Sequence, residues 1–381
     1  MTYSIGRNKI RNPHNGYKMS EYARAGVDYT KIEPFKRAMM EVGGRTLGFP
    51  KKWSVGIEDG NHFYYGGRPH VWRGIKEGLG NKNWIAEWMY QLSGTGRTYH
   101  NGIGVDTALM AVNDLIAFGA MPVIYLDEVA ASDSEWFQDE KRAEAFAEGL
   151  YSICKEVGMA LLGGESSSLR YLVKAEPPVE RAPVFSGTVT GIIAPNTHAV
   201  TGKKLCAGDC IIAATSSGLH ANGITLVIDR ALKLPEQFLT KLPNGNSLGE
   251  EALIPTRSYV ALVSTLLDCG VDVHALQPGT GGGVAKIAFH KRPFTYRIHS
   301  WVPIPPLFLF MQELDVSLHD CLTTFNWGGG YYIFVPPHEV ARTIELGSIL
   351  GYKMAEVGVV EEGERKVIFE PEGIILPPPG E

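Results

Sequence analysis

The stretch "APNTHAVTGKKLCAGD", residues 194–209, divides the sequence into two parts of similar length. It is rich in turn-forming residues, which is typical of a connection between domains. On both sides of it, short apolar runs of strand length alternate with longer amphipathic runs. We therefore expect two α/β domains, at residues 21–200 and 205–381, after a polar and flexible extension at residues 1–20.

The order of elements favours mixed sheets over purely parallel ones, because several expected strands follow each other directly. The expected helices are 32–42, 83–92, 104–120, 139–158, 222–234, 255–270, a helix opening at 281–289, and 337–351. The expected strands are a pair within 62–78, then 122–131, 160–165, 183–193, 210–218, 271–276, 353–362 and 365–370. Residues 321–335 are expected to form a strand pair or a bulged strand.

The composition is that of an ordinary folded soluble protein, and small anionic ligands remain possible. The 381 residues are 44% hydrophobic and 20% charged, with a formal net charge of −5, so nothing indicates a nucleic-acid partner. The most apolar long stretch, residues 108–126, is interrupted by Asn113, Asp114, Gly119 and Pro122, which argues against a membrane span. Five scattered cysteines indicate a reducing compartment, and we expect a cytoplasmic protein.

The segment "GVDTALMAVNDL", residues 104–115, carries two carboxylates in an apolar helix. Asp106 and Asn113 are seven residues apart and share a helix face, and Asp114 follows directly. A buried carboxylate is costly unless it is paired or binds a metal ion, and magnesium is held by one or two carboxylates. Alternatively, Asp106 caps the helix and Asp114 is a structural hydrogen-bond acceptor.

Three glycine-containing segments could bind phosphate. "KEGLGNKNW", residues 76–84, offers the backbone of Gly78 and Gly80 together with Asn81 and Lys82, although an ordinary strand-to-helix turn also fits. "GTGGGVAKIAF", residues 279–289, runs directly into an apolar periodic segment, so its amides and a helix dipole could face an anion. The candidate phosphate contacts in this segment are Thr280, Gly281, Gly282 and Gly283. "FNWGGG", residues 325–330, is either a ligand-facing bend or a bulge.

Two further segments place polar groups at the ends of expected strands. "LLGGESS", residues 161–167, contains Gly164 and Glu165, and the glutamate could orient a ligand or metal, or cap the next segment. "SSGLHANGITL", residues 216–226, is densely polar at the mouth of an expected helix. Its candidate contacts to a nucleotide or substrate are Ser217, Gly218, His220, Asn222 and Gly223. The sequence has neither a nucleophile elbow nor a dinucleotide-binding fingerprint.

Taken in order, nine segments resemble the phosphoribosylformylglycinamidine cyclo-ligase family, also called aminoimidazole ribonucleotide synthetases. They are "YARAGVDY", "EGLGNK", "GVDTALMAVNDL", "LLGGES", "SSGLHANGITL", "PTRSYV", "DVHAL", "TGGG" and "TFNWGGG". Each segment alone is modest, but nine in the same order are specific, and they span the sequence from Tyr22 to its C-terminal strands.

The resemblance implies an enzyme of purine biosynthesis that uses ATP and magnesium to close the imidazole ring of formylglycinamidine ribonucleotide. It implies a homodimer formed through the sheet of the N-terminal domain, with ATP in a cleft near the dimer interface. It implies that Lys82, Asp114, His220 and Asn222 serve catalysis. By the same resemblance, Glu77, Asp106 and Asp114 hold the metal, and the nucleotide contacts are Gly78, Gly80, Asn81, Lys82, Asp106, Asn113, Gly164 and Glu165.

The sequence departs from the family pattern at several positions. Glu77 stands where the family usually has aspartate, and Ser166 stands where it usually has threonine. Many members have a histidine just before the TGGG segment, where this sequence has Pro278 and Gly279. The alternatives are therefore another ATP-using enzyme of the superfamily, such as a formylglycinamidine ribonucleotide synthetase or a small-molecule kinase, or a nucleotide-binding homologue without catalysis.

Overall fold

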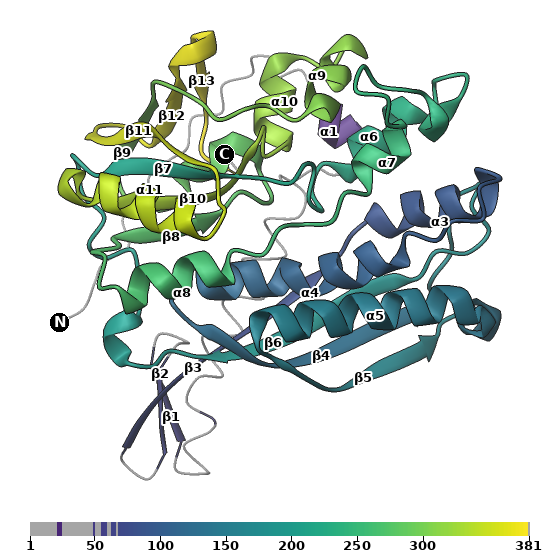
Figure 1. Cartoon of the computed structure of the whole chain (residues 1–381), viewed down its shortest axis with the longest axis horizontal. Helices are drawn as coiled ribbons and strands as arrows, with labels where there is room; N and C mark the ends of the chain where they lie inside the picture. Colours follow the sequence, from purple (N-terminus) through teal and green to yellow (C-terminus); the bar gives the residue numbers. More distant parts are fainter. Residues whose placement is uncertain (1–20, 25–48, 50–54, 59–61, 66–67, 380–381) are drawn as a thin grey trace, which may run out of the picture.

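Two sheets, each partly covered by helices, make up the protein in this computed structural model (Figure 1). The structure describes residues 21–24, 49, 55–58, 62–65 and 68–379. The last strand of the first sheet ends at Ile192 and the first strand of the second sheet begins at Cys210. The α/β class with mixed sheets is confirmed. Within the described residues, no helix has both the length and the hydrophobicity needed to cross a membrane.

The first sheet has six strands in the order β1-β2-β3-β6-β4-β5. Only the pairing of β4 with β5 is parallel; the other described pairings are antiparallel. The strand bounds are β1 Val55–Glu58, β2 His62–Tyr65, β3 Arg68–Gly78, β4 Met121–Ala131, β5 Ala160–Ser168 and β6 Val184–Ile192. Strand β5 is an edge strand, and most of its residues are exposed.

Helices α4 (His100–Ile116) and α5 (Glu140–Val157) lie side by side on one face of this sheet (Figure 1). Fourteen residues of α4 are buried because the helix also contacts α8 and β8 of the other half. Helix α5 is amphipathic; the Asp139 side chain caps its start, and Gly158, with φ 75°, ends it. Helix α3 (Lys82–Leu92) packs against α4, whereas the short α1 (Glu21–Arg24) packs against α6 and α10 of the other half.

The second sheet has seven strands in the order β13-β12-β9-β11-β7-β10-β8. Strands β7 and β8 both run antiparallel to β10, which lies between them, so β7 and β8 run parallel to each other. The strand bounds are β7 Cys210–Thr215, β8 Ala275–Pro278, β9 Phe294–Ile298, β10 Gly329–Val335, β11 Met354–Glu362, β12 Lys366–Phe369 and β13 Ile374–Leu376. The helices are α6 Ile224–Ala231, α7 Leu248–Ala252, α8 Val260–Asp268, α9 Pro306–Glu313, α10 Leu318–Thr324 and α11 Val340–Ile349.

Three predictions of local structure are wrong. Residues 318–324 form helix α10 rather than a strand, because Ser317 caps its start and the helix packs against α9 and residues 283–288. The segment after the glycine run is a 3₁₀ helix, Gly283–Ala288, too short to carry a strong dipole. Helix α8 begins at Val260, not at Pro255, because the Thr256 and Tyr259 amides donate to side chains of α4.

The strand expected at 271–276 lies further along the chain, since β8 spans Ala275–Pro278. The remaining expected elements are confirmed with small shifts of their ends, except for the helix expected at 32–42, which lies outside the described residues. The same is true of the proposed extension at residues 1–20 and of the Gly-Gly turn at residues 66–67. The strands predicted on either side of that turn are present as β2 and β3.

Candidate active site

A buried ion pair joins the first residue of α3 to the middle of α4. Lys82 Nζ lies 2.7 Å from Asp106 Oδ2, and neither side chain is exposed. Lys82 Nζ also donates to the carbonyl of Ile254, at 2.7 Å. Burial lowers the pKa of Lys82 and raises the pKa of Asp106, while their mutual attraction opposes both shifts. Both residues were predicted to contact the nucleotide; in the structure they contact each other.

The helix α4 is fixed to the loop before α8 by two side chains on one face. Asp106 Oδ1 accepts the amide of Thr256 at 2.6 Å. Seven residues further along α4, Asn113 Nδ2 donates to the carbonyl of Arg257 at 2.9 Å, and Asn113 Oδ1 accepts the amide of Tyr259 at 3.2 Å. The predicted shared face of Asp106 and Asn113 is confirmed, and it binds backbone groups of the second half of the chain.

Asp114 lies beside the glycine run that follows β8. Burial raises the pKa of Asp114, and the Lys286 charge and a hydrogen bond with Thr280 oppose this shift. Asp114 Oδ1 is buried and has no hydrogen-bond partner among the described residues. A carboxylate oxygen left in this state costs free energy unless a ligand or ion engages it. A polar cluster is therefore formed by Asp114, Thr280 and Lys286, and Asp114 Oδ1 in it can still accept a hydrogen bond or bind a cation.

The glycine run itself adopts left-handed backbone throughout. Gly281, Gly282 and Gly283 have φ values of 67°, 95° and 60°. A Cβ on Gly283 would lie 2.4 Å from the carbonyl oxygen of Leu322, so packing against α10 already requires a glycine there. At Gly282 the nearest atom to such a Cβ is Pro379 Cβ, at 3.2 Å. Added bulk is therefore less obstructed at Gly282 than at Gly283.

The loop between β7 and α6 is held by its own side chains and by Asn326. Ser217 Oγ donates to the carbonyl of Pro255 at 2.6 Å. Asn326 Nδ2 donates to the carbonyl of Gly218 at 2.8 Å. Gly223, with φ 79°, precedes the first residue of α6. These contacts fix the backbone on both sides of His220 and Asn222.

His220 is fully buried, and its proton can be placed on one nitrogen. The amide of Ser217 donates to His220 Nε2 at 3.3 Å, so the neutral ring carries its proton on Nδ1. Burial, together with the charges of Lys82 and Arg257, lowers the pKa of His220 to about 3. His220 Nδ1 and Asn222 Nδ2 are buried and have no partner among the described residues. The loop therefore presents two unused hydrogen-bond donors.

The segment at residues 78–82 reaches the same loop. Asn81 Nδ2 donates to Thr225 Oγ1, in the first turn of α6, at 2.9 Å. Gly80 is exposed and has φ 72°, and the amide of Leu79 donates to the carbonyl of Phe185. The end of strand β3, at Gly78, and the following Gly80 therefore lie at the boundary between the two halves.

Glu77, Gly164 and Glu165 lie on the first sheet and not in these loops. The strand register places Glu77 opposite Gly187, Gly187 opposite Asp127, and Asp127 opposite Gly164. A Cβ on Gly164 would lie 2.0 Å from Asp127 Oδ1, so this glycine makes room for the carboxylate. Glu165 is exposed on the edge strand.

Asp127 is a carboxylate that the sequence reasoning missed. Burial raises the pKa of Asp127, and its side chain lines a cavity of about 760 Å³ between α5 and the strands β4 and β5. The available signal was a charged residue within the apolar strand "PVIYLDEVAA" at the alternating position that also carries Tyr125. The loops at residues 78–82, 216–223 and 279–283 do not line this cavity.

The profile described as AIR synthase related protein, N-terminal domain, matches residues 90–193, and the corresponding C-terminal domain matches residues 207–370.

The chain belongs to the AIR synthase related family.

Within the AIR synthase related family, the chain is 32% identical to the phosphoribosylformylglycinamidine cyclo-ligase of Pyrococcus horikoshii over 94% of this chain and 100% of that protein. The AIR synthase related fold is also similar to a thiamine-monophosphate kinase from Stenotrophomonas maltophilia, with a TM-score of 0.54, 18% identity, and coverage of 82% of this chain and 90% of that one. Hydrogenase maturation protein HypE in complex with ATP gives a TM-score of 0.51 at 18% identity, covering 72% and 77% of the two chains.

Proposed function

We propose that this protein catalyses the ATP-dependent cyclisation of formylglycinamidine ribonucleotide to aminoimidazole ribonucleotide. The observation that carries the proposal is a set of three buried polar atoms without partners among the described residues: Asp114 Oδ1, His220 Nδ1 and Asn222 Nδ2. They come from two of the segments that resemble the cyclo-ligases, and a relative with the cyclo-ligase name aligns over its whole length. A buried polar atom without a protein partner is satisfied by a ligand, an ion or an ordered water, and these three belong to segments that resemble the cyclo-ligases.

The reaction needs positioning and charge neutralisation more than a nucleophile. The formyl oxygen attacks the γ-phosphorus of ATP, the bond from this phosphorus to the ADP oxygen breaks, and ADP leaves. The amidine nitrogen then attacks the activated formyl carbon, a carbon–nitrogen bond forms, and inorganic phosphate departs with the former formyl oxygen. Catalysis of such phosphoryl transfer rests on orientation and electrostatic stabilisation. This agrees with a site built from amides, glycines, a lysine and carboxylates.

Donors are supplied by the loop at residues 216–223. Because His220 is neutral with its proton on Nδ1, it can donate to a substrate or phosphate oxygen without adding charge. Asn222 Nδ2 provides a second donor from the same loop. Ser217 and Gly218 position this backbone through their contacts with Pro255 and Asn326. The run from Thr280 to Gly283 offers backbone amides, and we assign the phosphate contact to Gly281 and Gly282.

Magnesium is the cation whose chemistry fits the carboxylates. When bound, it neutralises charge on the ATP phosphates. Asp114 has a free carboxylate oxygen and is the metal ligand we favour. Glu77 and Asp127 share a row on the helix-covered face of the first sheet, and each is a candidate for a further magnesium ligand. Asp106 has both oxygens engaged, by Lys82 and by the Thr256 amide, so we assign it to positioning α4.

The remaining nucleotide contacts in the proposal follow the family resemblance. They are Gly78, Gly80, Asn81, Gly164 and Glu165, with Lys82 and Asn113 fixing the helices that flank them. We also propose a cytoplasmic homodimer formed through the first sheet. Its support is the face opposite α4 and α5, where Leu126 is 45% exposed and Val184 is 54% exposed.

The test is turnover of purified protein with ATP, magnesium and formylglycinamidine ribonucleotide, following ADP, phosphate and the aminoimidazole product. We expect one ADP and one phosphate for each ring closed. Release of ADP with another acceptor but not with this ribonucleotide would instead favour a different ATP-using enzyme of the superfamily. ATP binding without turnover on any of these substrates would favour a homologue without catalysis.

A further inference from the structure

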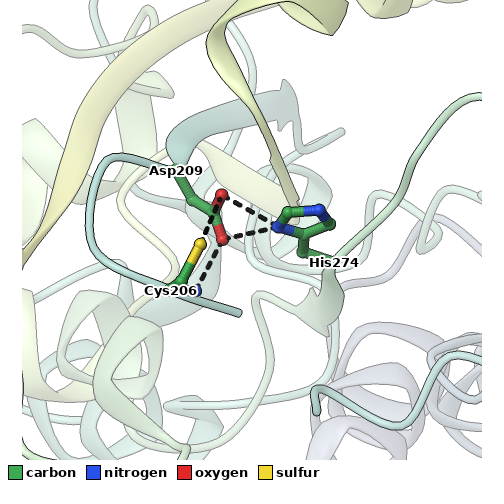
Figure 2. A group of neighbouring side chains, drawn as sticks. All are labelled: Cys206, Asp209 and His274. Carbon is green, nitrogen blue, oxygen red and sulfur yellow. Dashed lines mark hydrogen bonds and ion pairs between the residues drawn. The ribbon is translucent and has the colours of Figure 1, made fainter. Parts of the chain in front are cut away.

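Three side chains with different metal-binding atoms meet where β7 and β8 begin (Figure 2). Cys206 and Asp209 belong to the loop before β7, and His274 directly precedes β8. One ligand atom from each residue lies within 4.8 Å of the other two. His274 Nδ1 is 2.9 Å from both oxygens of Asp209, and Cys206 Sγ is 3.5 Å from Asp209 Oδ1.

The donor set matches the preferences of zinc. Zinc binds thiolate, imidazole and carboxylate together, at bond lengths of about 2.0–2.3 Å in tetrahedral geometry. Tetrahedral bonds of that length place neighbouring donor atoms about 3.3–3.8 Å apart. The separation of 3.5 Å between Cys206 Sγ and Asp209 Oδ1 lies in this range, and the 2.9 Å between His274 Nδ1 and Asp209 is shorter. Small side-chain rotations therefore suffice to surround an ion. A hard cation such as magnesium would gain little from the sulfur or the imidazole.

The surroundings of His274 resemble the outer shell of a metal site. Asp272 Oδ2 lies 3.2 Å from His274 Nε2, the ring nitrogen that faces away from Asp209. A carboxylate on the second nitrogen fixes the ring and leaves Nδ1 free to bind a metal. Lys204 Nζ, 2.6 Å from Asp272 Oδ1, holds that carboxylate in turn. Asp209 is itself oriented, because its Oδ2 accepts the amide of Cys206 at 2.9 Å.

The cluster lies at the opposite end of the strands from the proposed active site. The loop containing His220 follows the last residue of β7, and the glycine run follows the last residue of β8. The six residues of β7 span about 20 Å. An ion here would join the starts of two parallel strands that are separated by β10, without contacting the proposed nucleotide site.

We propose that Cys206, Asp209 and His274 bind one zinc ion, with a water molecule as the fourth ligand, and that this ion fastens the loop before β7 to the start of β8. Cys206 is exposed, so the site can be loaded from solvent. The proposal does not depend on the reaction that the protein catalyses.

The test uses untagged full-length protein freed of metal by a chelator and then titrated with zinc chloride in a calorimeter. We expect one zinc ion per chain. Cobalt(II) chloride replaces zinc in a parallel titration, because a thiolate ligand gives an intense charge-transfer absorption band. Cys206→Ser should lose this band and weaken zinc binding by more than about 100-fold, since outer-shell partners alone contribute about 10–100-fold. Asp272→Asn should weaken zinc binding by about 10–100-fold and keep the band.

The matched control is Cys269→Ser, which removes another exposed free cysteine and should bind zinc and cobalt like the unmodified protein. Each variant is first compared with the unmodified protein by circular dichroism in the metal-free state. The proposal is overturned if the unmodified protein binds no stoichiometric zinc. It is equally overturned if Cys206→Ser keeps the cobalt band, or if Cys269→Ser loses it.

Discussion

Lys82 Nζ lies 2.7 Å from Asp106 Oδ2, with both side chains completely buried. The pair joins α3 to α4, and through Ile254 and Thr256 it also joins both helices to the loop before α8. A buried ion pair contributes little net stability compared with apolar residues of the same volume, but breaking one partner away is costly. The pair therefore fixes the position of α4, which carries Asn113 and Asp114.

We expect Lys82→Met to lower the free energy of unfolding by about 3–5 kcal/mol, because it leaves Asp106 buried without its counter-charge. The double variant Lys82→Met with Asp106→Leu should recover a large part of this loss. Urea denaturation of the single and double variants measures both quantities. If the losses of Lys82→Met and of Asp106→Leu simply add in the double variant, the two residues are not coupled, contrary to the geometry.

The buried His220 predicts a specific dependence of stability on pH. Burial lowers its pKa to about 3, whereas an unfolded chain has a histidine pKa of about 6.5. Below pH ~6.5 the unfolded state binds a proton that the folded state does not, so stability falls as the pH drops toward 3. His220 should contribute a slope of about 1.4 kcal/mol per pH unit in this window.

His220→Asn should remove this contribution, and asparagine tolerates the φ of 58° at this position. The measurement is the unfolding free energy of both proteins at several pH values between 4 and 7, a range set by the unfolded pKa of about 6.5. His338→Asn, at an exposed position, serves as the control. Parallel pH profiles for the unmodified protein and His220→Asn would contradict the assignment.

Local patterns predicted most of the fold because hydrophobic periodicity is a local property. Helix α5 was predictable from its amphipathic sequence, its Asp139 cap and its terminal Gly158. Helix α10 was not, because "LHDCLTT" has weak helix propensity and owes its conformation to packing against α9 and residues 283–288. The start of α8 depends on hydrogen bonds to Asp106 and Asn113, which lie 150 and 146 residues before their partners in the chain.

The candidate site was predictable in its segments but not in its pairings. The sequence indicated Lys82 as a phosphate contact and Asp106 as a carboxylate in an apolar helix, and only the fold shows that they form an ion pair. Asp127 was missed because a charged residue in a strand, here followed directly by Glu128, resembles an ordinary surface position. The register across β3, β6, β4 and β5 aligns it with Glu77 and Gly164, and register is not encoded locally.

Gly282→Val should raise the Michaelis constant for ATP or for the ribonucleotide by at least about tenfold, because it puts a branched side chain where an anion approaches and where φ is 95°. Gly245→Val is the matched control, with φ 87° and open space around its added Cβ. Steady-state kinetics and a thermal melt of both variants separate binding from backbone strain. Unchanged Michaelis constants for both ligands in Gly282→Val would refute the phosphate assignment.

Leu126→Asp should convert a dimer into a monomer, because it places a charge on the sheet face that α4 and α5 leave uncovered. We expect light scattering to give twice 41.7 kDa for the unmodified protein and 41.7 kDa for the variant. Leu309→Asp, at a similarly exposed position on α9, should remain a dimer. A monomeric unmodified protein at micromolar concentration would contradict the proposed assembly.

Asp114→Asn keeps the size of the side chain and removes its charge. If Asp114 were only a structural acceptor, the amide would cost about 1 kcal/mol of stability and leave turnover nearly intact. As a magnesium ligand, it should reduce turnover by orders of magnitude while the fold survives, and added magnesium should restore part of the activity. Turnover is measured against magnesium concentration beside a thermal melt, with Asp268→Asn, 72% exposed, as the control. Near-normal turnover at ordinary magnesium would refute the role, and so would a loss that magnesium leaves unchanged.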